Sequence, residues 1–188
     1  MPMHDPVSGC GLLSKRLDRD EAGFGLIELL IAMTVLAVGI LALFAMFESG
    51  IRSISRASTV TTAGALADRE MENFRSIRYD AIGLPDDLVV AAATPYSTDS
   101  AYAATAGTAP GTRVALVACG TSPCTTDVPV QTLTGADGRS YRVDTYVTWQ
   151  AVGAGRVVKL VTIVVRDGTD VTKVWARTAS AFDESTGT

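Results

Sequence analysis

The chain has 188 residues, with 16 Lys and Arg against 20 Asp and Glu, one His and three Cys. A chain of this length forms one or two domains. The formal charge of -4 provides no large cationic field for a phosphate backbone, which argues against nucleic acid as the main partner. His4 alone cannot supply a Ser-His-Asp or Cys-His catalytic set unless this terminal residue folds into a site. We therefore expect neither an enzyme nor a bound cofactor.

An apolar run covers residues 24–47 and contains one charged residue, Glu28, and no Pro. As a helix, a run of this length would extend about 36 Å, which is enough to cross a hydrocarbon core of about 30 Å. A secretory signal has a shorter apolar region of about 7–15 residues, followed by a cleavage site. The run therefore predicts a single-pass membrane anchor that stays with the protein.

Glu28 is unusual because a carboxylate inside a bilayer is costly and commonly faces a partner or marks a function. No Lys or Arg lies within the apolar run, so a cationic partner would come from another chain or from processing. Cleavage after Gly23 would create an α-amine on Phe24, one helical turn from Glu28. The charge alone leaves open the alternative that Glu28 lies near the membrane edge and reaches the polar interface.

The start of the apolar run reads GFGLIELL over residues 23–30, and it resembles the processing site of type IV prepilins and the related pseudopilins. The resemblance implies that a membrane-embedded prepilin peptidase cuts after Gly23 and methylates the new amine of Phe24. It also implies that Glu28 pairs with the N-terminal amine of a neighbouring subunit during filament assembly. These residues are acted upon and do not catalyse.

Two features depart from the usual pattern of that family. The leader, residues 1–23, carries three basic residues but also four acidic ones, so it lacks a clear positive excess. Topology follows the count of Lys and Arg, and the three in the leader against Arg52 and Arg56 after the run weakly favour a cytoplasmic N-terminus. The apolar run also lacks the helix-bending Pro that many major pilins carry.

Residues 48–80 continue in a helical pattern, which predicts an amphipathic second half of the same helix. The β-branched stretch at residues 58–62 lowers helix propensity and predicts a kink or a fray there. Helix signals stop at the Gly-Leu-Pro sequence of residues 83–85. Residues 65–75 also bear a loose resemblance to the region after the anchor in PilV-type minor pilins and I-type pseudopilins.

Residues 81–188 are predicted to form a β-rich globular head. Residues 86–112 are rich in small and polar residues and are expected to form a long loop, more in keeping with a passive spacer than with a functional loop. Three segments alternate as strands do, which predicts an antiparallel meander with one face on the helix; they are residues 140–149, 156–166 and 170–182.

The expected fold class is therefore α+β, with a long N-terminal hydrophobic helix packed on a small antiparallel sheet, as in the lollipop arrangement that the resemblance implies. Residues 113–119 and 128–133 are candidates for additional short strands. Trp149 and Trp175 are expected in the core or on a strand face, because aromatic residues favour strands.

Cys119 and Cys124 form an even pair that suggests a disulfide in a domain outside the cytoplasm. So short a loop would gain only about 2 kcal/mol from the bond, so its role would be local shape. Cys10 would leave with the leader. No metal is expected, because two Cys without His do not complete a zinc site and no EF-hand pattern surrounds Asp137 or Asp167.

Our hypothesis from the sequence is a minor pilin similar to the PilV type, with prepilin peptidase, other pilins or pseudopilins, the inner-membrane assembly platform and the lipid bilayer as partners. It would reside in the cytoplasmic membrane with its head outside the cytoplasm, and in a surface filament after assembly. The alternatives are a type II secretion pseudopilin, an uncleaved single-pass envelope binding protein, and a head that binds DNA or a surface, with Arg139, Arg142 and Arg156 as a candidate basic patch.

Overall fold

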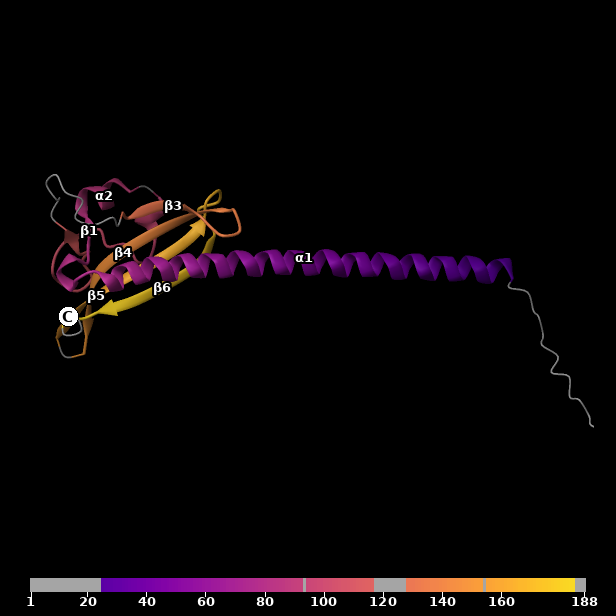
Figure 1. Cartoon of the computed structure of the whole chain (residues 1–188), viewed down its shortest axis with the longest axis horizontal. Helices are drawn as coiled ribbons and strands as arrows, with labels where there is room; N and C mark the ends of the chain where they lie inside the picture. Colours follow the sequence, from indigo (N-terminus) through magenta and orange to yellow (C-terminus); the bar gives the residue numbers. More distant parts are fainter. Residues whose placement is uncertain (1–24, 93, 117–127, 154, 185–188) are drawn as a thin grey trace, which may run out of the picture. The chain divides into compact units, whose positions relative to one another are not determined.

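The computed structural model describes residues 25–92, 94–116, 128–153 and 155–184 (Figure 1). The chain divides into two units, residues 1–48 and residues 49–188. Helix α1, Leu26–Ser76, begins in the first unit and continues into the second. A four-stranded antiparallel sheet follows the helix in the chain, which confirms the predicted α+β class.

The first unit consists, in its described part, of the apolar portion of α1. Every described side chain up to Ser58 is exposed, including the large apolar residues between Leu26 and Phe47. Straight-chain and apolar residues without Pro favour an uninterrupted helix here. By length and composition, α1 could cross a membrane, as the apolar run predicted.

In the second unit, one face of α1 is buried. Successive buried residues are one, three or four positions apart in the sequence, which is the spacing of a single helix face. They are Thr59, Ala63, Leu66, Ala67, Glu70, Met71 and Phe74. The β-branched stretch at residues 58–62, which predicted a kink or a fray, is helical throughout. The hydroxyls of Thr59 and Thr61 donate to the carbonyls of Ser55 at 3.0 Å and Ala57 at 2.9 Å, so these polar groups are satisfied within the helix.

Helix α1 ends at Ser76, a few residues before the predicted end near residue 80. Arg78 adopts an extended backbone, and a short 3-10 turn, Tyr79–Ala81, follows it. The buried Lys159 ammonium donates to the carbonyls of Tyr79 at 2.7 Å and Ile82 at 2.8 Å. A lysine on the sheet therefore holds the short 3-10 turn that follows the helix.

The sheet has the strand order β3-β4-β5-β6, and each neighbouring pair is antiparallel. The strands are β3 Val130–Thr134, β4 Ser140–Val152, β5 Arg156–Asp167 and β6 Val174–Phe182. The meander predicted from the sequence is thus confirmed. Strand β6 begins later than residue 170 because the intervening residues form a turn, closed by the amide of Asp167 donating to the Lys173 carbonyl at 3.0 Å.

One face of the sheet packs on the buried face of α1, as the alternation in β4 predicted. Tyr141, Val143 and Val147 of β4 belong to the same core cluster as Leu66 and Phe74 of the helix. Gln131 of β3 reaches the helix as well. The two tryptophans, at positions 149 and 175, are partly buried against this core.

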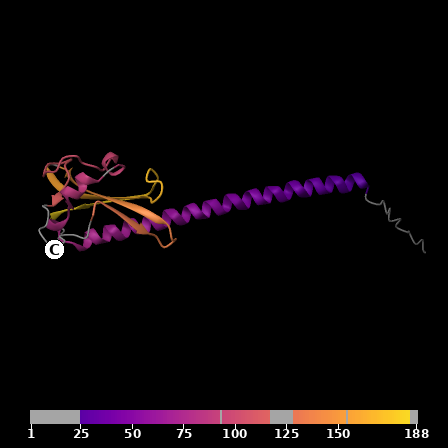
Figure 2. The same cartoon turned by 90° about the horizontal axis from the view of Figure 1, so that it is seen from above.

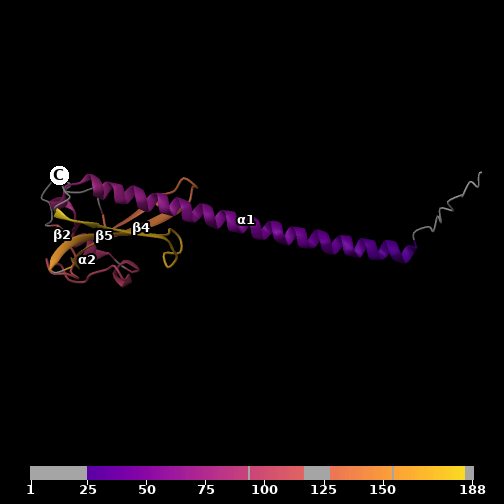
Figure 3. The same ribbon diagram turned by 90° about the horizontal axis from the view of Figure 1, so that it is seen from below.

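The other face of the sheet is covered by residues 84–116, which we call the covering segment (Figures 2 and 3). The sequence predicted a long loop over most of this range. The segment instead carries β1 Leu84–Pro85, α2 Asp86–Ala91, a 3-10 turn at Tyr96–Thr98, and β2 Ala115–Leu116, which pairs in parallel with β1.

The covering segment contributes to the core although it has few large apolar residues. The Tyr96 side chain is 1% exposed and its ring stacks on Tyr146 at a centroid distance of 4.4 Å. The amide of Val114 donates to the Val147 carbonyl at 2.9 Å, which attaches the end of the segment to β4. Leu84, Val89 and Val114 of the segment are buried in the same core cluster, so the segment is packed on the sheet by apolar contacts as well as by the tyrosine pair.

Candidate functional site

Glu28 lies in the first turn of α1. The Gly25 carbonyl accepts hydrogen bonds from the amides of Glu28 at 2.9 Å and Leu29 at 3.2 Å, and these bonds start the helix. Negative charge is favoured at a helix N-terminus, where backbone amides lack intrahelical partners. The Glu28 side chain is exposed among apolar neighbours and makes no ion pair within the part of the chain that the structure describes.

The other sequence-predicted site residues lie outside the described residues. These are Gly23 and Phe24, which flank the predicted cleavage point, and Cys119 and Cys124, which form the predicted disulfide. Of the predicted site, the structure therefore describes only Glu28.

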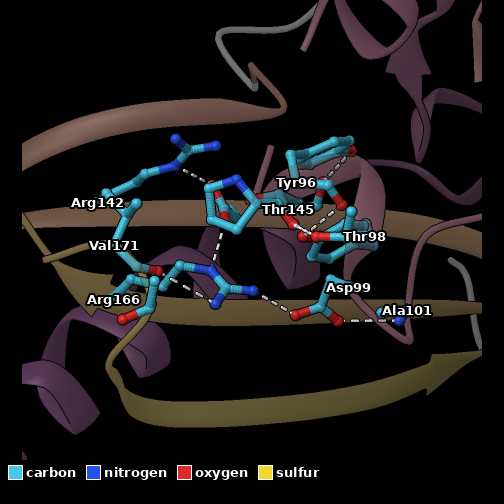
Figure 4. A network of polar contacts seen from close by, with 12 residues as sticks. Tyr96, Thr98, Asp99, Ala101, Arg142, Thr145, Arg166 and Val171 are labelled. Carbon is cyan, nitrogen blue, oxygen red and sulfur yellow. Dashed lines mark hydrogen bonds and ion pairs between the residues drawn. The ribbon is translucent and has the colours of Figure 1, made fainter. Parts of the chain in front are cut away.

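A network of charged side chains joins the covering segment to the sheet (Figure 4). Arg166 of β5 pairs with Asp99 and, through Nε at 2.7 Å, with Asp144. Arg142 Nε approaches Asp144 at 2.7 Å, and Arg177 Nη2 approaches Asp99 at 2.7 Å. The side chains of Asp144 and Asp99 are only 0% and 4% exposed, and each carboxylate faces two arginines, of which Arg177 remains open to solvent.

The protonation of this network follows from its geometry. Burial by itself raises the pKa of the Asp99 carboxyl, but hydrogen bonds from Arg177 and the Ala101 amide, with the charges of both arginines, lower that pKa overall. Burial raises the pKa of the Tyr96 hydroxyl, which donates to the Thr145 carbonyl at 2.7 Å. The network thus keeps Asp99 ionised and Tyr96 neutral, which suits a structural attachment.

A second ionic contact holds the covering segment together. Arg113 is buried, and its Nε donates to Asp86 at 2.6 Å while its Nη1 donates to the Ala103 carbonyl at 3.3 Å and to the Ala104 carbonyl. No buried side-chain polar atom in the described residues lacks a hydrogen-bond partner. The polar groups inside the second unit are thus committed to its fold.

Neither ionic contact was predicted from the sequence. A signal was present in β4 and β5, where the charged residues Arg142, Asp144 and Arg166 lie within strands and next to Val residues. Alternation alone assigns such residues to a solvent-facing side. Only the covering segment, which brings Asp99 and Tyr96 to that side, makes it an interior surface.

The three arginines considered as a basic patch do not lie together. Arg142 pairs in register with Arg166, whereas Arg156 pairs with Val152 at the opposite end of the β4–β5 hairpin. Arg142 is engaged by Asp144, and Arg156 Nη1 lies 2.9 Å from Asp183. Arg139 lies in the turn before β4 and donates to Ser55 at 3.3 Å. The second unit therefore offers no single cationic surface built from these three residues.

A metal site needs several ligating side chains close together. Among the described residues, no group of three His, Cys, Asp or Glu side chains is close enough to hold a metal ion. The Asp137 carboxylate accepts from the Tyr141 hydroxyl at 2.6 Å, and Asp167 accepts from the amide and hydroxyl of Thr169 at 2.9 and 2.6 Å. The carboxylates of Asp137 and Asp167 thus accept hydrogen bonds from residues in or next to their own turns.

One comparison with known proteins gives a match. The family described as "Prokaryotic N-terminal methylation motif" matches residues 18–44. No curated protein and no solved structure matches the chain significantly. The matched range includes the predicted cleavage point, Glu28 and most of the apolar run. It supports a type IV pilin-like or pseudopilin protein that is anchored in a membrane, processed by prepilin peptidase and assembled with other pilins, and it points to a structural subunit rather than an enzyme.

Proposed function

We propose that this chain is a minor pilin of a type IV pilus, similar to the PilV type, that primes a filament or is incorporated into it. The observation that carries the proposal is the sequence GFGLIELL at residues 23–30, placed at the start of an apolar helix that is long enough to cross a membrane. The methylation-motif match over residues 18–44 supports the prepilin-like part of this proposal.

Processing would proceed in the cytoplasmic membrane. The peptide bond between Gly23 and Phe24 is cut, the leader leaves, and the new α-amine of Phe24 is methylated. The second unit lies on the outer side of the membrane in this orientation. Cys119 and Cys124 would then be in an oxidising compartment, where a disulfide between them can form.

Assembly would exchange lipid for the helices of sister subunits. The apolar part of α1 is exposed along its whole length, so the helix has a large surface to bury in a bundle. Within that bundle, an unpaired Glu28 carboxylate would be costly, whereas a pair with the N-terminal amine of a neighbour removes the cost. Burial therefore drives association, and the charge pair fixes the axial register between subunits.

The test is a deletion strain that is examined for two separate phenotypes, surface filaments and secretion of exoproteins. We expect the deletion to reduce the number of filaments per cell and to leave secretion intact, with recovery on expression of the wild-type chain. Loss of secretion with normal filaments would instead identify a type II secretion pseudopilin and would overturn the minor-pilin proposal. A strain in which both processes are normal would contradict both assignments.

A further inference from the structure

A cationic groove lies on the second unit, between α1 and the turns at one end of the sheet. Its lining includes four cations, Arg52, Arg56, Arg139 and Lys173, together with the half-buried Trp175, and it includes no carboxylate. This composition differs from that of the chain as a whole, which has an acidic excess. The lining of the groove is thus positively charged, although the chain as a whole is negatively charged.

Three guanidinium groups converge on one stretch of α1. Arg52 and Arg56 are four residues apart, so their side chains share a face of the helix. Arg139 reaches that stretch from the β3–β4 turn, since its Nη2 donates to Ser55 Oγ at 3.3 Å. The planar donors of arginine match the oxygens of a phosphate.

Nearby carboxylates compensate the groove only in part. Asp137 lies 3.9 Å from Arg139, but its carboxylate is already bonded to the Tyr141 hydroxyl at 2.6 Å. Asp170 pairs with Lys173 at 2.9 Å, with both side chains largely exposed, and exposed pairs of this kind are weak. Arg52 also takes part in a polar interaction, whereas Arg56 has no ion-pair partner among the residues that the structure describes. The positive surplus of the groove therefore comes from Arg56 and from the exposed, weakly compensated Arg139 and Lys173.

The position of the arginines along α1 indicates which anion they meet. Arg52 and Arg56 follow Phe47, the last residue of the apolar run, by five and nine residues. At the rise of an α-helix these separations are about 8 and 14 Å. The polar headgroup layer extends about 5–8 Å beyond the hydrocarbon, and long basic side chains reach back toward it. Tryptophan is also common at membrane interfaces, and Trp175 lines the groove.

We propose that this groove binds the phosphate of an anionic phospholipid in the membrane that anchors the chain. The inference rests on the membrane anchorage in the proposed function and extends it, because it assigns a lipid class and a binding site on the second unit. Anionic leaflets attract clustered Lys and Arg near the membrane surface, whereas zwitterionic headgroups do not carry the net charge for this attraction.

Native mass spectrometry of the full chain in detergent tests the proposal. The protein is mixed with equal amounts of phosphatidylglycerol and phosphatidylcholine that carry the same acyl chains, and the ratio of the two retained lipids is measured. We expect the wild-type chain to retain phosphatidylglycerol preferentially. The double variant Arg56→Gln/Arg139→Gln should lower this preference by about fivefold for each arginine removed.

The matched control is Arg75→Gln/Arg78→Gln, which removes the same charge from the far end of α1 and the residues just after it. Arg75 and Arg78 are exposed and pair with Glu72 and Asp80, so the control should keep the wild-type preference. Equal losses in the two double variants, or no preference in the wild type, would overturn the proposal. A cross-link from residue 56 to an acidic residue of a neighbouring subunit, without lipid preference, would identify the groove as a subunit contact instead.

Carbonate extraction of native membranes separates this proposal from the one on which it rests. If the chain stays in the membrane pellet but shows no lipid preference, only the proposed phospholipid site in the groove is rejected. A chain that is released into the supernatant rejects the membrane anchor and, with it, the proposed function. In either case, the unfolding midpoint of the double variant should equal that of the control, because Arg56 and Arg139 are exposed.

Discussion

The Tyr96 hydroxyl donates a hydrogen bond of 2.7 Å to the Thr145 carbonyl, across 49 residues of sequence. This single contact joins the middle of the covering segment to the central part of β4. The Tyr96 ring stacks on Tyr146 and meets Tyr102 edge-on, so the hydroxyl is held in a buried aromatic cluster. The covering segment is therefore part of the folded core.

Tyr96→Phe tests this attachment. The substitution keeps the stacked ring but leaves the buried Thr145 carbonyl without this donor, so the free energy of unfolding should fall by about 1–2 kcal/mol. Urea denaturation of the full chain in detergent, followed by tryptophan fluorescence, measures the change. Tyr102→Phe is the matched control, because the Tyr102 hydroxyl makes no hydrogen bond within the described residues. Equal losses in the two variants would show that the hydrogen bond contributes nothing specific.

Asp99→Asn should destabilise the fold by about 2 kcal/mol at pH 7, because the charge-assisted bonds to Arg166 and Arg177 are weakened. The pKa of Asp99 is lower in the folded protein than its ordinary value of 3.8. Its stabilisation is therefore complete above about pH 4 and is lost as the pH falls through the folded value. The difference between wild type and variant should shrink in denaturation curves below pH 4. A constant difference from pH 7 to pH 3 would exclude this role for the charge.

Phe74 and Ile54 lie on the same helix but differ in environment, with 1% and 72% of their surfaces exposed. Phe74→Ala should lower the free energy of unfolding by about 3–5 kcal/mol, because it removes an aromatic ring from the interface between α1 and the sheet. Ile54→Ala should change it by less than about 0.5 kcal/mol. Urea denaturation followed by tryptophan fluorescence measures the free energy of unfolding of both variants. Similar losses would mean that the buried face of α1 has been assigned incorrectly.

Much of the fold could be predicted because its signals are local. The apolar run from residue 24, the helical period after it and the alternation in β4 each depend on residues within one element. Strand alternation also identified the face with Tyr141 and Val143, which packs on α1. The prediction of a fray at the threonine-rich stretch was wrong, because the buried face that Thr59, Ala63 and Leu66 present to the sheet outweighs their local helix propensity.

The remaining features depend on contacts between distant residues. Asp99 has no local signal, because its partners Arg166 and Arg177 lie 67 and 78 residues away in the sequence. Lys159 lies among valines and leucine in β5, and the sequence does not show how its ammonium is satisfied. Its burial is possible because the carbonyls of Tyr79 and Ile82 accept hydrogen bonds from it. Composition alone therefore could not show that the covering segment folds onto the sheet.

Glu28→Ala separates processing from assembly. Because the cut lies five residues before Glu28, the variant should still lose its leader, but it should enter filaments poorly, since it cannot pair with the amine of a neighbour. Immunoblots of sheared filaments and of membranes measure the two pools. Glu72→Ala is the control, because Glu72 is an exposed residue that pairs only with Arg75 in the described structure and should assemble normally. Normal incorporation of Glu28→Ala would refute the register mechanism.

Intact mass and N-terminal sequencing of the protein from its native membrane show whether the chain is a processed prepilin-like subunit. We expect a chain that starts at Phe24 with an N-methylated amine, and a Gly23→Arg variant that keeps its leader. A wild-type chain that retains residues 1–23 in cells with an active prepilin peptidase would contradict this expectation, and an uncleaved single-pass envelope protein would then be the better description.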